Sequence, residues 1–90
     1  MIRVVQFTAP WCGPCKPVAL ILAELAPAYP DVDFSELDVD TDFEAGVRHD
    51  VLMLPTVIVF RDDEVVARLE GARRRKDYER ALAEVVEAAE

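Results

Sequence analysis

The feature that most constrains this chain is its single pair of cysteines. Cys12 and Cys15 are the only cysteines, and two residues separate them. The apolar run Ile2–Thr8 precedes the pair, and a helical pattern of apolar residues follows it. Cys12 is therefore expected where a strand ends and a helix begins, so that backbone N–H groups and the helix dipole stabilise its thiolate. A second thiol one turn later can form a disulfide with the first, and the pattern indicates reversible dithiol–disulfide exchange.

Two inert interpretations of the pair are weaker. A structural zinc site needs four ligands, whereas His49 is the only histidine and no second cysteine pair exists, so two chains would have to share the site. A purely structural disulfide over so short a loop would restrict the unfolded chain very little. His49 is expected to be an ordinary residue on a helix surface, and no pattern pairs it with Cys12 in the manner of a protease.

Charge and composition exclude several classes of protein. The 18 acidic residues outnumber the 10 basic ones, giving a net charge of −8, which argues against a nucleic-acid partner. No segment approaches the roughly 20 apolar residues of a membrane span. Arg3 interrupts the first apolar stretch, so no export signal is expected. We therefore expect a cytoplasmic protein, and in that reducing compartment a cysteine pair is usually catalytic or metal-binding.

Hydrophobic patterning predicts the strands and the first helix. Strands are expected where Val, Ile and Phe are frequent: Ile2–Thr8, Val32–Val39, Pro55–Phe60 and Glu64–Glu70. The first helix follows Cys12 and ends at Pro27 and Pro30. One of its faces carries the apolar residues Val18, Ile21, Leu22 and Leu25.

The remaining elements are a short helix, a hairpin and a final helix. Thr41 and Glu44 fit a capping box, with Thr41 as N-cap of a helix that runs to about His49. The hairpin at Asp62 and Asp63 needs a positive φ, which Asp63 is expected to adopt. The final helix is expected to begin at Asp77 and to turn inward Tyr78, Leu82, Val85, Val86 and Ala89.

This order, βαβαββα, predicts an α/β fold in one domain that comprises residues 1–90. Consecutive βαβ units predict parallel strand pairing with right-handed crossovers, and the tight last connection predicts an antiparallel hairpin. The expected architecture is a four-stranded mixed sheet with helices on both faces.

Three motifs resemble the thioredoxin family. Trp11, Cys12, Gly13, Pro14, Cys15 and Lys16 match the family's active-site sequence throughout. Leu54, Pro55 and Thr56 match its cis-proline loop, and Gly71 matches the glycine that lets a substrate backbone approach. The likeness covers nearly the whole chain. The leading strand and helix of full-length thioredoxins are lacking, so the chain is closer in extent to glutaredoxin.

The resemblance implies a protein thiol–disulfide oxidoreductase with a redox-active Cys12–Cys15 disulfide and no other cofactor or metal. Cys12 would attack a substrate disulfide as the nucleophile, and Cys15 would resolve the resulting mixed disulfide. Gly13 and Pro14 would set the turn that holds the two sulfurs within reach.

The resemblance also implies a surface that binds substrate. A cis bond before Pro55 would bring the proline against the cysteines and leave the Leu54 backbone free to pair with an extended substrate. An apolar surface around the sulfurs would comprise Trp11, Met53, Leu54, Gly71 and Ala72. Trp11 is expected on this exposed face rather than in the core, and Met53 fits either packing or binding.

Two positions depart from the family pattern. Gln6 stands where thioredoxins bury an aspartate, and Glu36 stands where the neighbouring strand usually supplies a lysine. One hypothesis is that Glu36 accepts the Cys15 proton, directly or through water. The alternative is a solvated Glu36, with water as the proton carrier.

The run Arg73, Arg74, Arg75 and Lys76 is also unusual, because cations oppose the dipole at a helix start. It fits either a solvated charged segment or a docking patch for an acidic partner.

Gly13 and Pro14 between the cysteines resemble disulfide reductases more than oxidising relatives. The expected protein is a monomeric electron carrier that reduces protein disulfides and is recharged by a thioredoxin-reductase-like flavoprotein using NADPH. The alternatives are a thiol oxidase or isomerase, and an interaction module with secondary redox chemistry.

Overall fold

The computed structural model describes residues 1–88 and has the expected order of strands and helices. The predicted strands all form, and each strand end either coincides with the expected residue or differs from it by one residue. The elements are β1 (Ile2–Thr8), α1 (Cys15–Leu25), the 3-10 turn η1 (Ala26–Ala28), β2 (Val32–Asp38), α2 (Phe43–Arg48), β3 (Thr56–Arg61), β4 (Glu64–Glu70) and α3 (Arg75–Ala88).

The four strands form one mixed sheet in the order β2-β1-β3-β4. β1 pairs with β2 in parallel, and β3 and β4 form the expected antiparallel hairpin. β3, however, is antiparallel to β1. The expectation that both βαβ units are parallel is therefore wrong for the second unit.

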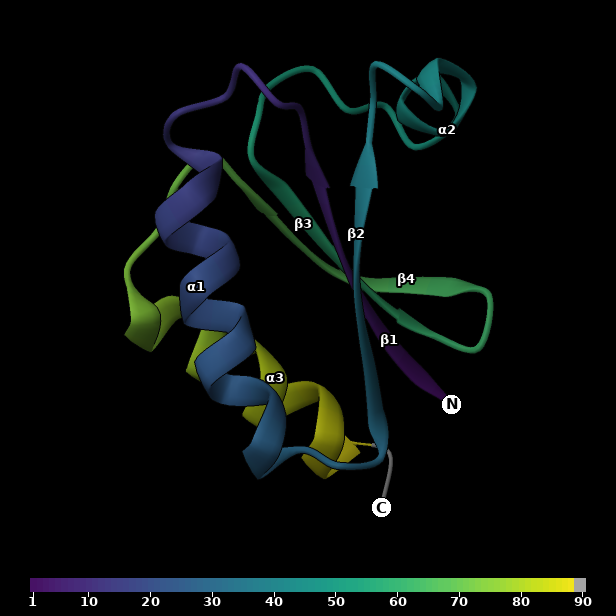
Figure 1. Ribbon diagram of the computed structural model, residues 1–90. Helices are drawn as coiled ribbons and strands as arrows, with labels where there is room; N and C mark the ends of the chain where they lie inside the picture. The colour runs from purple at the N-terminus through teal and green to yellow at the C-terminus, as the bar shows by residue number, and fades with distance from the viewer. Residues whose placement is uncertain (89–90) are drawn as a thin grey trace.

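The length of α2 explains this reversal. A helix of six residues rises only about 9 Å, whereas a strand of seven residues spans about 23 Å. The segment between β2 and β3 therefore does not return to the start of the sheet. α2 lies beyond the carboxyl end of β2, and the chain enters β3 from that same end (Figure 1).

Helices contact both faces of the sheet, as expected, but α2 does so only near the carboxyl end of β2. α1 and α3 lie together on one face (Figure 1), where their buried residues pack on Val4, Val57 and Val59. The opposite face forms a second cluster in which Ala45 of α2 joins buried strand residues. Those strand residues are Val5, Phe7, Ile58 and Phe60. The alternation of β1 and β3 between two covered faces explains their nearly continuous apolar sequence.

Two predicted turn details are wrong. Asp42, not Thr41, caps α2, because its carboxylate accepts a hydrogen bond from the Ala45 N–H at 3.2 Å. Thr41 instead donates its hydroxyl to the Asp38 carbonyl. In the hairpin, Asp62 adopts the positive φ of 56°, not Asp63.

The final helix starts two residues earlier than expected. α3 begins at Arg75. The Asp77 carboxylate, in the first turn of the helix, accepts a 3.3 Å hydrogen bond from the Arg74 N–H, which has no acceptor within the helix. The predicted inward residues Tyr78, Leu82 and Val85 are buried. Val86 is half-buried, and Ala89 lies outside the described residues.

Candidate active site

The two cysteines lie in the connection between β1 and α1 and form a disulfide. Their Cα atoms are 5.4 Å apart. β1 ends at Thr8 and α1 begins at Cys15, so Cys12 sits in a turn ahead of the helix rather than directly at its start. This turn is held by hydrogen bonds from the Cys12 N–H to the Ala9 carbonyl and from the Cys15 N–H to the Cys12 carbonyl. The strand and the helix thereby fix the two sulfurs against each other.

The cysteines are nearly buried, while the side chain beside them is exposed. Cys12 is 5% exposed and Cys15 2%, whereas Trp11 is 70% exposed. The Trp11 indole N–H donates a 2.9 Å hydrogen bond to the Asp40 carboxylate, which orients the ring at the surface. Trp11 therefore belongs to an exposed face beside the disulfide, as expected.

An apolar cavity of about 370 Å³ opens on one side of the disulfide. It brings together Cys12 with three residues expected at the site, Trp11, Met53 and Leu54. Gly13 and Pro14 line it as well. Leu54 also packs against the small cluster that contains both cysteines.

A more polar cavity of about 450 Å³ opens on the other side. Both cysteines line it, together with Lys16, Glu36 and Asp38. Cys12 is thus common to the two cavities, whereas Cys15 faces only the polar one. Charged groups capable of proton transfer are consequently found on the Cys15 side.

Gln6 links this polar side to the cysteines. Its side chain is fully buried, and its amide N–H donates a 2.9 Å hydrogen bond to the Cys15 carbonyl. Within residues 1–88, the amide oxygen of Gln6 has no hydrogen-bond partner. Glu36 is the register neighbour of Gln6 on β2, and the two residues line one cavity beside α1.

The loop before β3 contains the cis peptide bond that the resemblance implies, between Leu54 and Pro55. Thr56 stabilises this loop by donating its hydroxyl to the Met53 carbonyl at 2.6 Å. The Gly71 N–H donates a 2.8 Å hydrogen bond to the Pro55 carbonyl.

Gly71 has a φ of +78°, and a Cβ at this position would lie 3.6 Å from the Met53 sulfur. Glycine is required here by the backbone conformation rather than by lack of space. Pro55, Gly71 and the exposed Ala72 adjoin the loop but do not line the apolar cavity.

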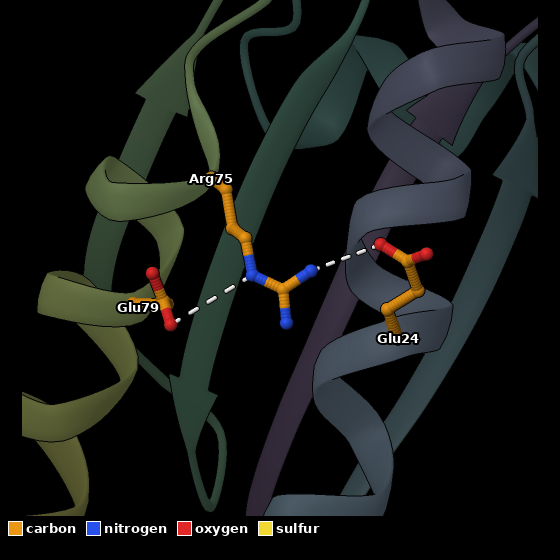
Figure 2. A network of polar contacts seen from close by, with 3 residues as sticks. All are labelled: Glu24, Arg75 and Glu79. Carbon is orange, nitrogen blue, oxygen red and sulfur yellow. Dashed lines mark hydrogen bonds and ion pairs between the residues drawn. The ribbon is translucent and has the colours of Figure 1, made fainter.

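The basic run is partly used within the protein. Arg75 forms an ion pair with Glu24 of α1 at 2.9 Å and with Glu79 one turn along α3 at 3.8 Å, as Figure 2 shows. Arg73 donates its side-chain N–H to the Glu70 carbonyl, and its backbone N–H to the Tyr78 hydroxyl. The segment is therefore more than a freely solvated run, since two of its cations tie α3 to its surroundings.

His49 is not an ordinary surface residue. It ends α2, is half-buried, and packs its ring against Phe7 and Phe60 with centroid separations of 5.8 Å and 5.4 Å. Burial, followed by the charges of nearby arginines, lowers the pKa of His49 below 6.5. The sequence did not predict this packing, because α2 has only six residues and the spacing of its apolar residues does not define a buried face.

Within residues 1–88 no group of three or more His, Cys, Asp or Glu side chains is arranged to hold a metal ion. In the same part of the chain, no helix has the length and hydrophobicity needed to cross a membrane.

Sequence reasoning missed part of the site. Asp40 was not identified as the partner of Trp11, and Asp38 was not placed beside the cysteines. Three apolar residues of the cavity, Phe43, Val47 and Leu52, were also missed. The available signal was the i, i+4 spacing of Phe43 and Val47 on α2.

Comparison with known proteins gives consistent matches to one family. The family model described as Thioredoxin matches residues 1–84. The chain is 39% identical to a thioredoxin of Staphylococcus epidermidis over 87 residues, covering 96% of this chain and 80% of that protein. It is 42% identical to a thioredoxin of Mycobacterium tuberculosis over 84 residues, covering 92% and 72%.

Solved structures agree with these sequence matches. The thioredoxin of Trypanosoma brucei brucei superposes with a TM-score of 0.88 at 31% identity, covering 97% of this chain and 76% of that one. The thioredoxin of Fasciola hepatica gives a TM-score of 0.82 at 36% identity, covering 91% and 79%.

Proposed function

Because the chain belongs to the thioredoxin family, we propose that it reduces disulfide bonds in protein substrates with the Cys12–Cys15 pair. The observation that carries this function is the disulfide itself, which joins the only two cysteines in the turn between β1 and α1. The family uses a redox-active disulfide on protein disulfides, and this chain has such a pair.

In the proposed reaction, the reduced protein begins with a Cys12 thiolate that attacks one sulfur of the substrate disulfide. A bond forms between Cys12 and that sulfur, the substrate S–S bond breaks, and the leaving sulfur takes up a proton. Cys15 then loses its proton and attacks Cys12, which releases the second substrate thiol. Two electrons pass to the substrate, and the Cys12–Cys15 disulfide is formed.

The division of roles between the cysteines is supported by their surroundings. Cys12 lines both cavities, including the open apolar one, so an incoming disulfide reaches it first. Cys15 is less exposed and adjoins only the polar cavity, as suits a group that attacks an internal sulfur. Gly13 and Pro14 span the turn between them, and Lys16 adds a positive charge at the start of α1.

Glu36 is proposed as the acceptor of the Cys15 proton. It lines the polar cavity together with Cys15, and it is the register neighbour of Gln6, whose amide holds the Cys15 carbonyl. Gln6 is fully buried but cannot titrate, so the exposed Glu36 on the adjacent strand is proposed to supply the carboxylate for this step.

Substrate binding is proposed for the loop around Pro55. The exposed Met53 and the half-buried Leu54 lie beside Cys12, and Gly71 is bonded to the loop through the Pro55 carbonyl. Ala72 is exposed next to Gly71. An extended substrate that crossed these residues would place its disulfide against Cys12.

The wider assignment is also a proposal. We infer a monomer in the cytoplasm that is recharged by a flavoprotein resembling thioredoxin reductase, with NADPH as the electron source. We also infer that residues 1–90 act as one domain. The family match from residue 1 to 84 and the packing of both hydrophobic clusters on one sheet support this.

The reduction potential of the cysteine pair tests the direction of the reaction. The protein is equilibrated in glutathione buffers and the redox state is followed through Trp11 fluorescence, with Cys12→Ser as a control that cannot form the disulfide. We expect a potential below the roughly −220 to −260 mV of a cytosolic glutathione pool. A value well above this range would replace the reductase with an oxidase or isomerase and remove the cytoplasmic assignment.

A further inference from the structure

The outer side of β2 carries backbone groups that no other strand uses. In the order β2-β1-β3-β4, β2 pairs only with β1 within residues 1–88. The Val39 N–H donates to the Thr8 carbonyl, so the backbone groups of odd-numbered residues here point toward β1. Because successive residues of a strand point to opposite sides, those of Phe34 and Glu36 point away from β1. Their N–H and C=O groups are therefore available to an added strand.

A cavity of about 500 Å³ lies between β2 and α1. Phe34, Ser35 and Glu36 line it from β2. The other lining residues come from β1, α1 and η1 and are mostly small: Gln6, Ala19, Leu22, Ala23 and Ala26. A strand added to β2 would direct every second side chain to the α1 side of the sheet, where this cavity offers them space.

The polar groups that line this cavity accept hydrogen bonds. Gln6 is fully buried, and within residues 1–88 its amide oxygen has no partner. Glu36 adds an exposed carboxylate, and Ser35 adds a hydroxyl. An occupant that brings N–H donors is therefore favoured over one that brings further acceptors.

The charge of the strand specifies which donors fit. Asp33, Glu36 and Asp38 lie on β2, and residues 31–38 include no basic residue. Asp38 accepts a hydrogen bond from the Asp40 N–H. In the part of the chain that the structure describes, none of the three β2 carboxylates forms an ion pair. Opposite charges on neighbouring strands attract, so lysine or arginine on the added strand would complement this edge.

We propose that the outer edge of β2 binds an extended segment of a basic partner protein, which adds a fifth strand to the four-stranded sheet. On the α1 side, the segment places an apolar side chain opposite Phe34 and lysine or arginine opposite Glu36 and Asp38. This edge is separate from the apolar cavity beside Cys12, because the two cavities share no lining residue. Binding therefore requires neither a disulfide in the partner nor a change in the redox state of the cysteines.

The test titrates the oxidised, isotope-labelled full chain with the capped peptide Val-Thr-Lys-Thr-Lys-Thr-Val. This peptide reads the same in both directions, so it fits a parallel or an antiparallel added strand. NMR should show that the N–H signals of Phe34 and Glu36 shift and gain protection from hydrogen exchange. A peptide with Glu in place of both lysines should bind at least about tenfold more weakly.

N-methylation separates backbone pairing from simple attraction between charges. One derivative is methylated at both lysine amide nitrogens and another at two threonine amide nitrogens, which point to opposite sides of an extended peptide. One derivative should bind like the unmethylated peptide. The other should bind at least about tenfold more weakly, because its methylated nitrogens face β2 and cannot donate.

Variants of the protein test the contribution of charge from the other side. Glu36→Gln should weaken binding of the lysine peptide severalfold, and it should not weaken binding of the glutamate peptide. Asp63→Asn is the matched control, because this carboxylate is also exposed but lies between β3 and β4, away from the β2 edge. Its affinity for the lysine peptide should equal that of the parent protein.

Three results would overturn the proposal: unchanged β2 amide signals at the solubility limit of the peptide, equal affinity for the lysine and glutamate peptides, or equal affinity for the two methylated derivatives. Peptide-free spectra in which the β2 signals broaden as the protein concentration rises would instead assign the edge to a second copy of the chain.

Discussion

At the scale of single residues, the proposed transfer of the Cys15 proton depends on Gln6 and Glu36. Gln6 donates a hydrogen bond to the Cys15 carbonyl but has no ionisable group, and its amide oxygen has no partner in the part of the chain that the structure describes. Glu36 stands beside it on β2. The two residues have different roles. The Gln6 amide positions the start of α1, and the Glu36 carboxylate faces the polar cavity.

If Glu36 accepts the proton, Glu36→Gln should slow release of the second substrate thiol by roughly tenfold to a hundredfold. The first attack by Cys12 should keep its rate. Stopped-flow fluorescence for the first step and rapid quench with intact-mass analysis for the second would separate the two. Cys15→Ser supplies the mass of the stalled mixed disulfide.

Asp38→Asn is the matched control, because this carboxylate lines the same cavity. Compared with Glu36→Gln, the variant Glu36→Asp should recover part of the rate of the second step, together with the pH dependence of that rate. An unchanged second step in Glu36→Gln would return the proton to water, and an equal loss in Asp38→Asn would show that the effect is not specific to Glu36.

At the scale of elements, the start of α2 provides a direct test of helix capping. Asp42→Ala should lower the free energy of unfolding by about 1 kcal/mol, because the Ala45 N–H loses its acceptor. Thr41→Ala should cost only a few tenths of this, since its hydroxyl bond to Asp38 is exposed. Urea unfolding of both variants gives the comparison, and the reverse order would identify Thr41 as the cap.

The elements also show how far sequence reasoning extends. Strand and helix positions followed from apolar periodicity, because a buried face requires that period wherever the element lies. Helix starts were shifted, because Thr41 and Asp42 are both good caps, and because Asp77 acts from within α3. The direction of β3 was missed, since it depends on how far α2 carries the chain, and local patterns do not contain that information.

In the candidate site, too, some residues could be predicted from the sequence and others could not. The cysteine motif and the cis-proline loop were identified from short matches, and the structure brings Trp11, Met53 and Leu54 together with Cys12. Phe43, Val47 and Leu52 belong to no such motif in the sequence. Only their exposure around one cavity reveals a common surface.

At the scale of the whole molecule, His49 should couple stability to pH. Burial and the charges of Arg48, Arg68 and Arg3 lower its pKa below 6.5, and Asp50 opposes them only in part. The unfolded chain then binds the proton more readily than the folded one. The stability that His49 contributes is complete above about pH 6.5 and is lost as the pH falls through the lower folded pKa.

The variant His49→Phe keeps an aromatic ring against Phe7 and Phe60, and it removes the only histidine of the sequence. Urea unfolding is measured for both proteins between pH 5 and 7.5. As the pH falls, the free energy of unfolding of the parent protein should decrease relative to that of His49→Phe. A difference between the two that stayed constant over this range would contradict the prediction.

β2 is an edge strand of the sheet, and its composition determines whether two copies of the protein can pair along this edge. An edge strand offers unpaired N–H and C=O groups to any extended chain, including a second copy of itself. Residues 31–38 contain Asp31, Asp33, Glu36 and Asp38 and no basic residue. Two such edges that paired without a register shift in parallel, or with Asp31 opposite Asp38 in antiparallel, would set carboxylate against carboxylate. Repulsion between the acidic side chains therefore opposes the approach of two identical edges before backbone pairing can begin.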